Sequence, residues 1–342
     1  GNDWYIGNTP LSAAQNGGTL GGLARWRHPD MPYSLSEYDH PTPSEHQSEM
    51  FPMLSSFAAY QDWDALYQFC WETQDTPDTP PRLKGYFDMA YNPAKSLLAP
   101  FAALVFRRGL VAPAAEQVIL EIPEGLLESR LPFGFPGPSS ALDGYPESAF
   151  FTARLGTRVV PGDGPVRVNK SSAAIVTGIP WQTPQISWTH PAEKRGRYEV
   201  NAPQVRMLTG QFETGAEQHL GDVLFRFQAS ADSTVTAALV ALDEQPLAQS
   251  RRMLLCVVSS IANSGMKWDE ARRSVAGHWG KAPVIAAAVP FTVQLPGDAK
   301  PLVRALNPAG EPIADMPVTG QAGRWELQAD PAQSSLWFSI SR

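Results

Sequence analysis

The pattern of hydrophobic and polar positions divides the chain at about residue 115. Before this point, short apolar runs alternate with stretches in which apolar side chains recur at helical spacing. After it, short β-rich runs follow one another, separated by turn signals such as "PAEKRG" and "LPGDAK" and without long helices between them. The first pattern is typical of β/α alternation and the second of a β-sandwich. The predicted fold class is therefore α/β followed by all-β.

The N-terminal part contains two expected strands, each followed by an expected helix. Residues 32–36 read "PYSLS", and residues 65–72 read "ALYQFCWE", a nearly continuous apolar and aromatic run. Such a run is typical of a strand that is covered on both faces. After the first strand, Ser44 and Gln47 have the spacing of a capping box, which predicts a helix start. After the second, Asn92 followed by proline predicts a helix cap and first turn.

Composition excludes several classes of function. The 342 residues are enough for two domains, and the formal net charge of −7 argues against a partner held by nucleic-acid phosphates. The longest apolar runs are too short and too interrupted by proline to span a bilayer. Two distant cysteines, Cys70 and Cys256, exclude a disulfide framework and a four-thiolate metal site. The six histidines are scattered, so the sequence predicts no metal and no cofactor.

The strongest candidate for chemistry is Glu37, which stands at the end of the first expected strand. Glycoside hydrolysis needs two carboxyl groups across the scissile bond, and in β/α barrels such groups lie at the carboxyl ends of strands. Trp71 lies at the equivalent end of the second strand, where an indole ring can stack on a sugar. The candidate substrate-binding residues are Trp71, Tyr38, Asp39, His40, Trp4, Tyr5 and Glu72.

Each candidate has a plain structural alternative. Glu37 is also compatible with a surface carboxylate in a turn, and Trp71 with an aromatic side chain of the core. Asp39 and His40 either line the site or satisfy the hydrogen bonds of their own loop. Trp4 is equally compatible with a hydrophobic plug. These alternatives stay open at the level of sequence.

The order of the N-terminal segments resembles a known family. "PYSLSEYDHP", a helix, "YQDWDALYQFCW" and "NPAKSLLAPFAALVFRRGLV" together resemble the last quarter of a clan A retaining glycoside hydrolase, a (β/α)8 TIM barrel. The resemblance implies that Glu37 is the nucleophile at the end of barrel strand seven, and that residues 66–71 form strand eight with Trp71 at a sugar subsite. Residues 1–115 would then be the C-terminal part of the barrel. Residues 116–342 would be a β-sandwich region of one or two sub-domains.

The resemblance also implies a partner and a place of action. The acid/base glutamate of that clan has no counterpart in this sequence, so it is expected on an N-terminal fragment or chain that completes the barrel. The implied enzyme is bacterial, secreted or periplasmic, and cleaves a polysaccharide such as agar, β-glucan or mannan in an endo fashion, without a cofactor. The alternative from another class is a non-catalytic carbohydrate-binding or structural β-sandwich protein that carries a relic barrel.

Overall fold

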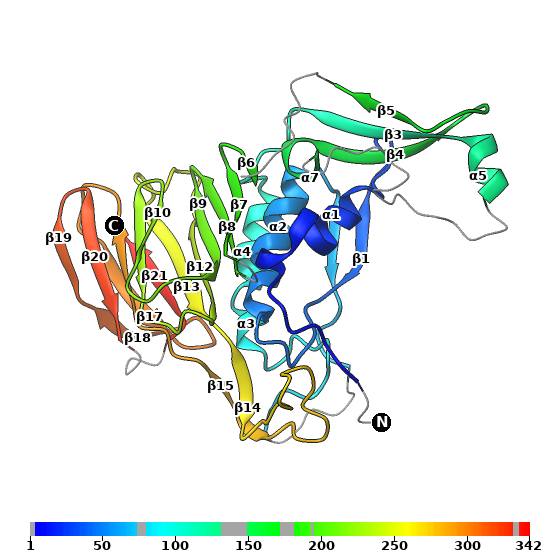
Figure 1. Cartoon of the computed structure of the whole chain (residues 1–342). Coiled ribbons are helices and arrows are strands. Elements are labelled where there is room, and N and C mark those ends of the chain that lie inside the picture. Colours follow the sequence, from blue (N-terminus) through cyan, green and yellow to red (C-terminus); the bar gives the residue numbers. More distant parts are fainter. Residues whose placement is uncertain (1–3, 74–79, 131–148, 172–180, 193–194, 331–334) are drawn as a thin grey trace.

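The computed structural model describes residues 4–73, 80–130, 149–171, 181–192, 195–330 and 335–342. Strands take up 38% and helices 17% of the structure. Two large sheets and a layer of helices form the main body, and a three-stranded sheet and an antiparallel pair of strands project from it (Figure 1). In the described residues, no helix is both long enough and apolar enough to cross a membrane.

Two antiparallel sheets form a sandwich. The nine-stranded sheet has the order β18 (Pro312–Met316), β17 (Leu302–Leu306), β21 (Trp337–Ser341), β13 (Arg252–Val258), β12 (Thr234–Ala241), β9 (Val205–Gln211), β8 (Arg195–Ala202), β7 (Ile186–Ala192) and β6 (Trp181–Gln182). The five-stranded sheet has the order β10 (Glu217–Leu220), β11 (Val223–Phe227), β16 (Phe291–Leu295), β20 (Arg324–Ala329) and β19 (Val318–Gln321). An apolar core fills the space between them, which confirms the predicted sandwich.

Strand β12 shows why the central strands read as continuous apolar runs. Every residue of β12 is buried, because successive side chains point to opposite faces and both faces are covered. Val235 and Leu239 belong to the core of the sandwich. Ala238 and Val240 belong to a second core on the other face of the same sheet, which packs against the helices.

The helix layer lies between the nine-stranded sheet and a small parallel sheet (Figure 1). It consists of α1 (Gly18–Ala24), α2 (Met50–Tyr60), α3 (Pro93–Ser96), α4 (Ala99–Arg107) and the short 3-10 turns η1 (Leu11–Ala13), η2 (Gln15–Gly17) and η3 (Gln47–Glu49). The predicted cap at Asn92 is confirmed, because its side chain accepts a hydrogen bond from the N–H of Lys95 at 3.2 Å. The helix expected directly after Ser44 begins later, with η3, and α2 starts only at Met50.

The small parallel sheet contains the two strands expected in the N-terminal part. β1 (Ser34–Tyr38) and β2 (Ala65–Gln68) are adjacent and parallel, as predicted. In the described part of the chain this sheet has two strands.

The predicted C-terminal quarter of a (β/α)8 TIM barrel is wrong. The structure is mostly strand, and the described residues contain no recognisable part of such a barrel. The reason lies in the packing of α2, which is buried along its whole length except at Phe51. One side of α2 contacts the nine-stranded sheet, where the hydroxyls of Ser56 and Tyr198 are 2.9 Å apart. A barrel helix has an outer face in solvent, whereas α2 fills the space between two sheets. The domain boundary near residue 115 stays a prediction.

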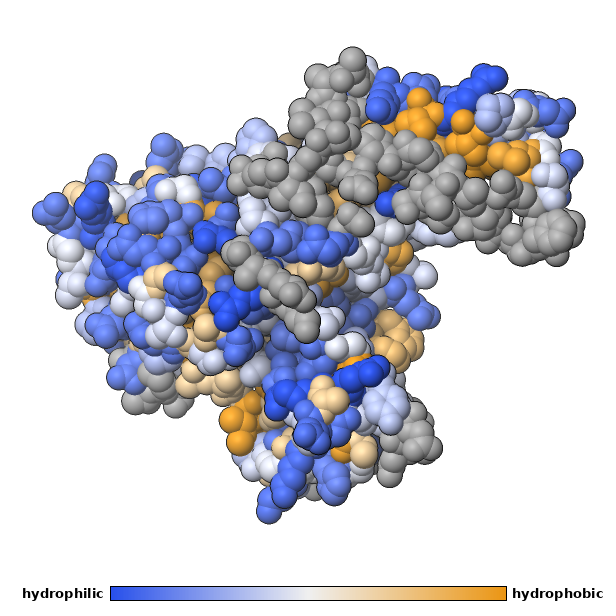
Figure 2. Space-filling view, in the orientation of Figure 1, coloured by the Kyte–Doolittle hydropathy of each residue, from blue (hydrophilic) through white to orange (hydrophobic). Residues whose placement is uncertain are grey.

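Two parts project from the body (Figures 1 and 2). One is the sheet of β4 (Arg154–Val160), β3 (Gln117–Pro123) and β5 (Arg167–Lys170), with α5 (Glu124–Arg130) beyond its end and α7 (Ala149–Thr152) at its base. The other is the antiparallel pair β14 (Ile261–Ser264) and β15 (Lys281–Ala286) with the segment between them. We call residues 261–286 the arm. It leaves the sandwich and reaches the N-terminal residues of the chain (Figure 1).

Candidate functional site

Glu37 lies at an irregularity near the carboxyl end of β1. Leu35 pairs with Leu66 and Tyr38 pairs with Gln68, so β1 uses one residue more than β2 between these two pairs. The side chains of Leu35 and Tyr38 are buried, whereas Glu37 is exposed. Such bulges change the direction of a side chain and are frequent beside active sites. The irregularity therefore presents the Glu37 carboxylate to solvent from an otherwise anchored strand.

Exposed aromatic side chains follow on β2 and the loop after it. Tyr67, the residue of β2 between the two pairs, is 60% exposed, and Trp71 is 63% exposed. Trp71 is held through its backbone, because its carbonyl accepts a hydrogen bond from the N–H of Ala90 at 2.8 Å. The ring of Phe69 meets that of Phe87 at 5.9 Å between centroids. The structure thus favours a surface role for Trp71 over a place in the core.

Asp39 is not a free acid of the site. Its Oδ1 lies 2.5 Å from Nζ of Lys95 on α3, with both side chains buried. Its Oδ2 accepts a hydrogen bond from the Gln68 side chain at 2.7 Å. Burial raises the pKa of Asp39 to about 7, although Lys95 and Gln68 act in the opposite direction, and burial lowers the pKa of Lys95. The pair ties the loop after Glu37 to α3 and to β2.

Tyr38 and His40 border a cavity of about 320 Å³ beside this loop. The Tyr38 hydroxyl lies 3.3 Å from Nε2 of His40. Burial lowers the pKa of His40 to about 4, so its imidazole is neutral at neutral pH. Asp39 also lines the cavity, as do residues 6–11. The three residues that follow Glu37 therefore line one hollow.

Trp4 and Tyr5 lie against the arm. The Trp4 ring packs against Tyr86 at 5.2 Å and against Trp279 of the arm at 5.8 Å between centroids. Tyr5 is exposed, and the guanidinium of Arg273 lies 5.4 Å from the centre of its ring. Trp4 thus acts as a packing residue, the alternative left open by the sequence. Glu72, directly after Trp71, is half-buried.

Sequence reasoning missed four residues of this region, namely Lys95, Tyr86, Phe87 and Trp279. A fully buried lysine is rare without a partner, but only the structure reveals that the partner is Asp39. Tyr86 and Phe87 lie in the loop after β2, and no motif in the sequence marks them. Trp279 lies in the β-rich part of the sequence, and no local pattern links it to Trp4.

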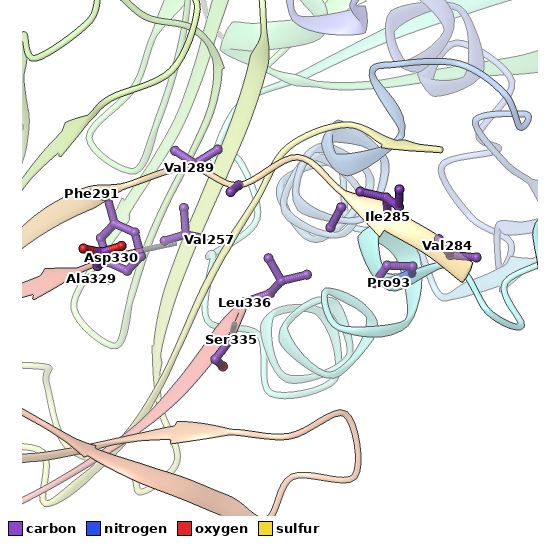
Figure 3. Close-up of a pocket in the computed structure, with 12 residues that line it drawn as sticks. Pro93, Val257, Val284, Ile285, Val289, Phe291, Ala329, Asp330, Ser335 and Leu336 are labelled. Carbon is purple, nitrogen blue, oxygen red and sulfur yellow. The ribbon is translucent and has the colours of Figure 1, made fainter. Parts of the chain in front are cut away.

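A larger cavity of about 490 Å³ lies between the base of the arm and the sandwich (Figure 3). Val257, Ile285 and Leu336 are among the apolar side chains that line it, and Asp330 and Ser335 are its polar members. This lining suits an apolar group better than hydrolytic chemistry. Among the described residues, no three His, Cys, Asp or Glu side chains are arranged to hold a metal ion.

Comparison with known proteins finds no family model, no curated protein and no solved structure that matches this chain. A functional assignment therefore depends on the geometry around Glu37.

Proposed function

We propose that this protein hydrolyses β-glycosidic bonds of a polysaccharide by a retaining mechanism, with Glu37 as the nucleophile. The observation that supports the proposal is an exposed carboxylate at a strand irregularity opposite Tyr67, whose ring is exposed, with the exposed ring of Trp71 just beyond the end of the same strand. Aromatic faces bind the apolar faces of sugar rings, and a carboxylate held beside them can attack the anomeric carbon. Displacement of the leaving oxygen then gives a covalent glycosyl-enzyme, which water hydrolyses.

The surroundings of Glu37 suit a fixed nucleophile. The buried Asp39–Lys95 pair anchors the loop two residues further on, and Gln68 joins this pair to β2. His40 is neutral at neutral pH, so it adds no positive charge that would weaken the nucleophile. The mechanism needs two carboxyl groups and no cofactor.

The second carboxyl group is assigned to another polypeptide segment, in this protein or in a partner. Asp39 is unsuited to the role, because it is buried and paired with Lys95. Parallel sheets are normally covered on both faces, yet Tyr67 and Trp71 are exposed beside the two-stranded parallel sheet. A segment packed near these rings can bring an acid/base about 5–5.5 Å from Glu37, the separation of retaining enzymes. Because the substrate is a polymer, we expect the protein to act outside the cytoplasm and to cleave bonds in the interior of the polysaccharide.

The same exposed rings also favour a second candidate, a non-catalytic carbohydrate-binding protein. In that case Tyr67 and Trp71 bind sugar, and Glu37 contributes a hydrogen bond only. The two candidate functions predict different turnover but the same sugar binding.

The test compares Glu37→Gln, Trp71→Ala and wild-type protein, each purified with any polypeptide that accompanies it. Release of reducing ends is measured on β-glucan, mannan and agar, and binding to the same polymers by sedimentation. Glu37→Gln should lower turnover by about a thousandfold or more while binding persists, since the attacking charge is lost and the shape is kept. Trp71→Ala should instead weaken binding up to about tenfold.

Glu244→Gln is the matched control, because it makes the same exchange at an exposed position of the turn after β12. Wild-type turnover in Glu37→Gln would contradict the mechanism. Binding by all forms without any hydrolysis would support the second candidate, and absence of binding would rule out both.

A further inference from the structure

The arm is fastened to the loop that follows β2. Asn263 of β14 is buried, and its Oδ1 accepts a hydrogen bond from the N–H of Leu83 at 2.8 Å. Its Nδ2 donates to the carbonyl of Leu83 at 2.7 Å and to that of Trp279 at 2.9 Å. Arg82 adds a hydrogen bond to the carbonyl of Gly280 at 3.2 Å. One amide side chain thus satisfies both backbone groups of a loop residue and fixes the loop relative to the arm.

The tip of the arm has a second attachment. Arg272 forms an ion pair with Glu45, with Nε to Oε2 at 2.9 Å. Asn8 bridges the two segments, since its Nδ2 donates to the carbonyl of Arg272 at 2.9 Å and to Glu45 Oε2 at 3.1 Å. The N–H of Ile6 donates to the carbonyl of Arg273 at 2.9 Å. The arm is therefore held along its length and at its tip.

Aromatic rings form a continuous series from the arm to the residues after β2. Trp279 meets Tyr86 at 5.5 Å, Tyr86 meets Phe87 at 6.4 Å, and Phe87 meets Phe69 at 5.9 Å between centroids. Phe69 is two residues before Trp71. Tyr86, Phe87 and Phe69 are 38–40% exposed. We call Trp279, Tyr86, Phe87, Phe69 and Trp71 the aromatic row.

We propose that the aromatic row is an extended binding site for successive sugar units of a polysaccharide, and that the arm is the element that positions it. The role of the row beside a cleavage point rests on the function proposed for Glu37, whereas sugar binding by the row does not. Partly exposed rings offer apolar faces to pyranose rings. The edge-to-face packing of Trp279 with Tyr86, and of Phe69 with Phe87, fixes the orientation of these four rings. A chain long enough to reach Tyr86 gains contacts that a disaccharide at Trp71 lacks. Asn263 is a positioning residue, because it acts through Leu83 and Trp279.

The test measures affinity for disaccharides and hexasaccharides of β-glucan, mannan and agar by calorimetry. The variants are Tyr86→Ala, Phe87→Ala and Asn263→Ala, all made in the Glu37→Gln background so that ligands stay intact. Each ring removed should weaken hexasaccharide binding about threefold to tenfold and change disaccharide binding less than twofold. Asn263→Ala should weaken hexasaccharide binding about tenfold, because the row loses its support. Lys267→Ala, an exposed position on the same arm, should keep both affinities.

Tyr86→Ala and Phe87→Ala keep the test decisive if Asn263→Ala disturbs the arm itself. Hexasaccharide affinity unaltered in both ring variants would overturn the proposal, as would an equal loss for short and long ligands. If the ring variants lose hexasaccharide affinity and the wild type shows no turnover, the proposal for the row is supported and the hydrolase is refuted. Full turnover by the wild type, with hexasaccharide affinity unaltered in the ring variants, would support the hydrolase and refute the proposal for the row.

Discussion

Glu49 makes the stability of this protein depend on pH in a defined direction. This carboxyl is 0% exposed, and its Oε2 accepts a hydrogen bond from the N–H of Ser12 at 3.3 Å, while its Oε1 accepts one from the Ser12 hydroxyl. The carbonyl of Ser12 accepts a hydrogen bond from Nε1 of Trp188 on β7 at 2.6 Å. Glu49 therefore lies where the N-terminal segment, the helix layer and the nine-stranded sheet meet.

Burial raises the pKa of Glu49 from 4.5 to about 7, although the hydrogen bonds from Ser12 lower it. Between these two values the folded protein keeps a proton that the unfolded chain has lost, so the free energy of unfolding falls as pH rises. Each pKa unit corresponds to about 1.4 kcal/mol, so the fall amounts to about 3 kcal/mol. The stabilisation is complete below about pH 4.5 and is lost as pH rises through about 7.

The assay is urea unfolding of wild type and Glu49→Gln at about pH 4.5, about pH 6 and about pH 8. The glutamine side chain of this variant would resemble the protonated acid at every pH, so the variant should gain about 3 kcal/mol relative to wild type across this range. Asp39, whose pKa burial also raises, contributes equally to both proteins and cancels in the difference. Glu244→Gln serves as the control. Parallel stability curves for wild type and Glu49→Gln would refute the reasoning.

Two further changes test the packing around the site and between the layers. Lys95→Met removes the partner of the buried Asp39 carboxylate and should lower the free energy of unfolding, measured in urea, by about 3–5 kcal/mol. Adding Asp39→Asn should restore part of this loss. Full stability of the single variant would contradict a buried ion pair. Gly196→Ala would place a Cβ 1.9 Å from the carbonyl oxygen of Ser12, so β8 and η1 must separate. The free energy of unfolding should fall by about 1–3 kcal/mol. An unchanged midpoint of urea unfolding would contradict this close approach.

Local patterns in the sequence were sufficient for the elements but not for their assembly. The parallel pair β1 and β2, the cap at Asn92 and the sandwich strands follow from periodicity and capping, which act over a few residues. The barrel was inferred by extending local order to a global fold. The contacts that decide otherwise, such as Ser56 with Tyr198, join residues 142 positions apart. No periodicity reports which sheet a buried helix will contact.

For the candidate site too, local features follow from the sequence, whereas contacts between distant residues do not. Exposure of Glu37 and Trp71 near the ends of neighbouring strands agrees with what strand order predicts. The partner of Asp39 was missed, because Lys95 reads as one cation of an ordinary amphipathic segment. The arm was missed for a stronger reason, since Asn263 and Leu83 lie 180 positions apart and neither belongs to a motif.

The position of the loop after Glu37 depends on the sandwich as well as on β1. His46 in this loop lies 2.7 Å from the hydroxyl of Thr234 on β12, and the Thr236 hydroxyl donates to Ser48 at 3.0 Å. Glu45 is paired with Arg272 at the tip of the arm. Residues of the β-rich part therefore hold the segment that leads from Glu37 to α2. Because these contacts are buried or paired, the sandwich is part of the framework of the candidate site, and a substitution on β12 can shift the segment that follows Glu37 without touching Glu37 itself.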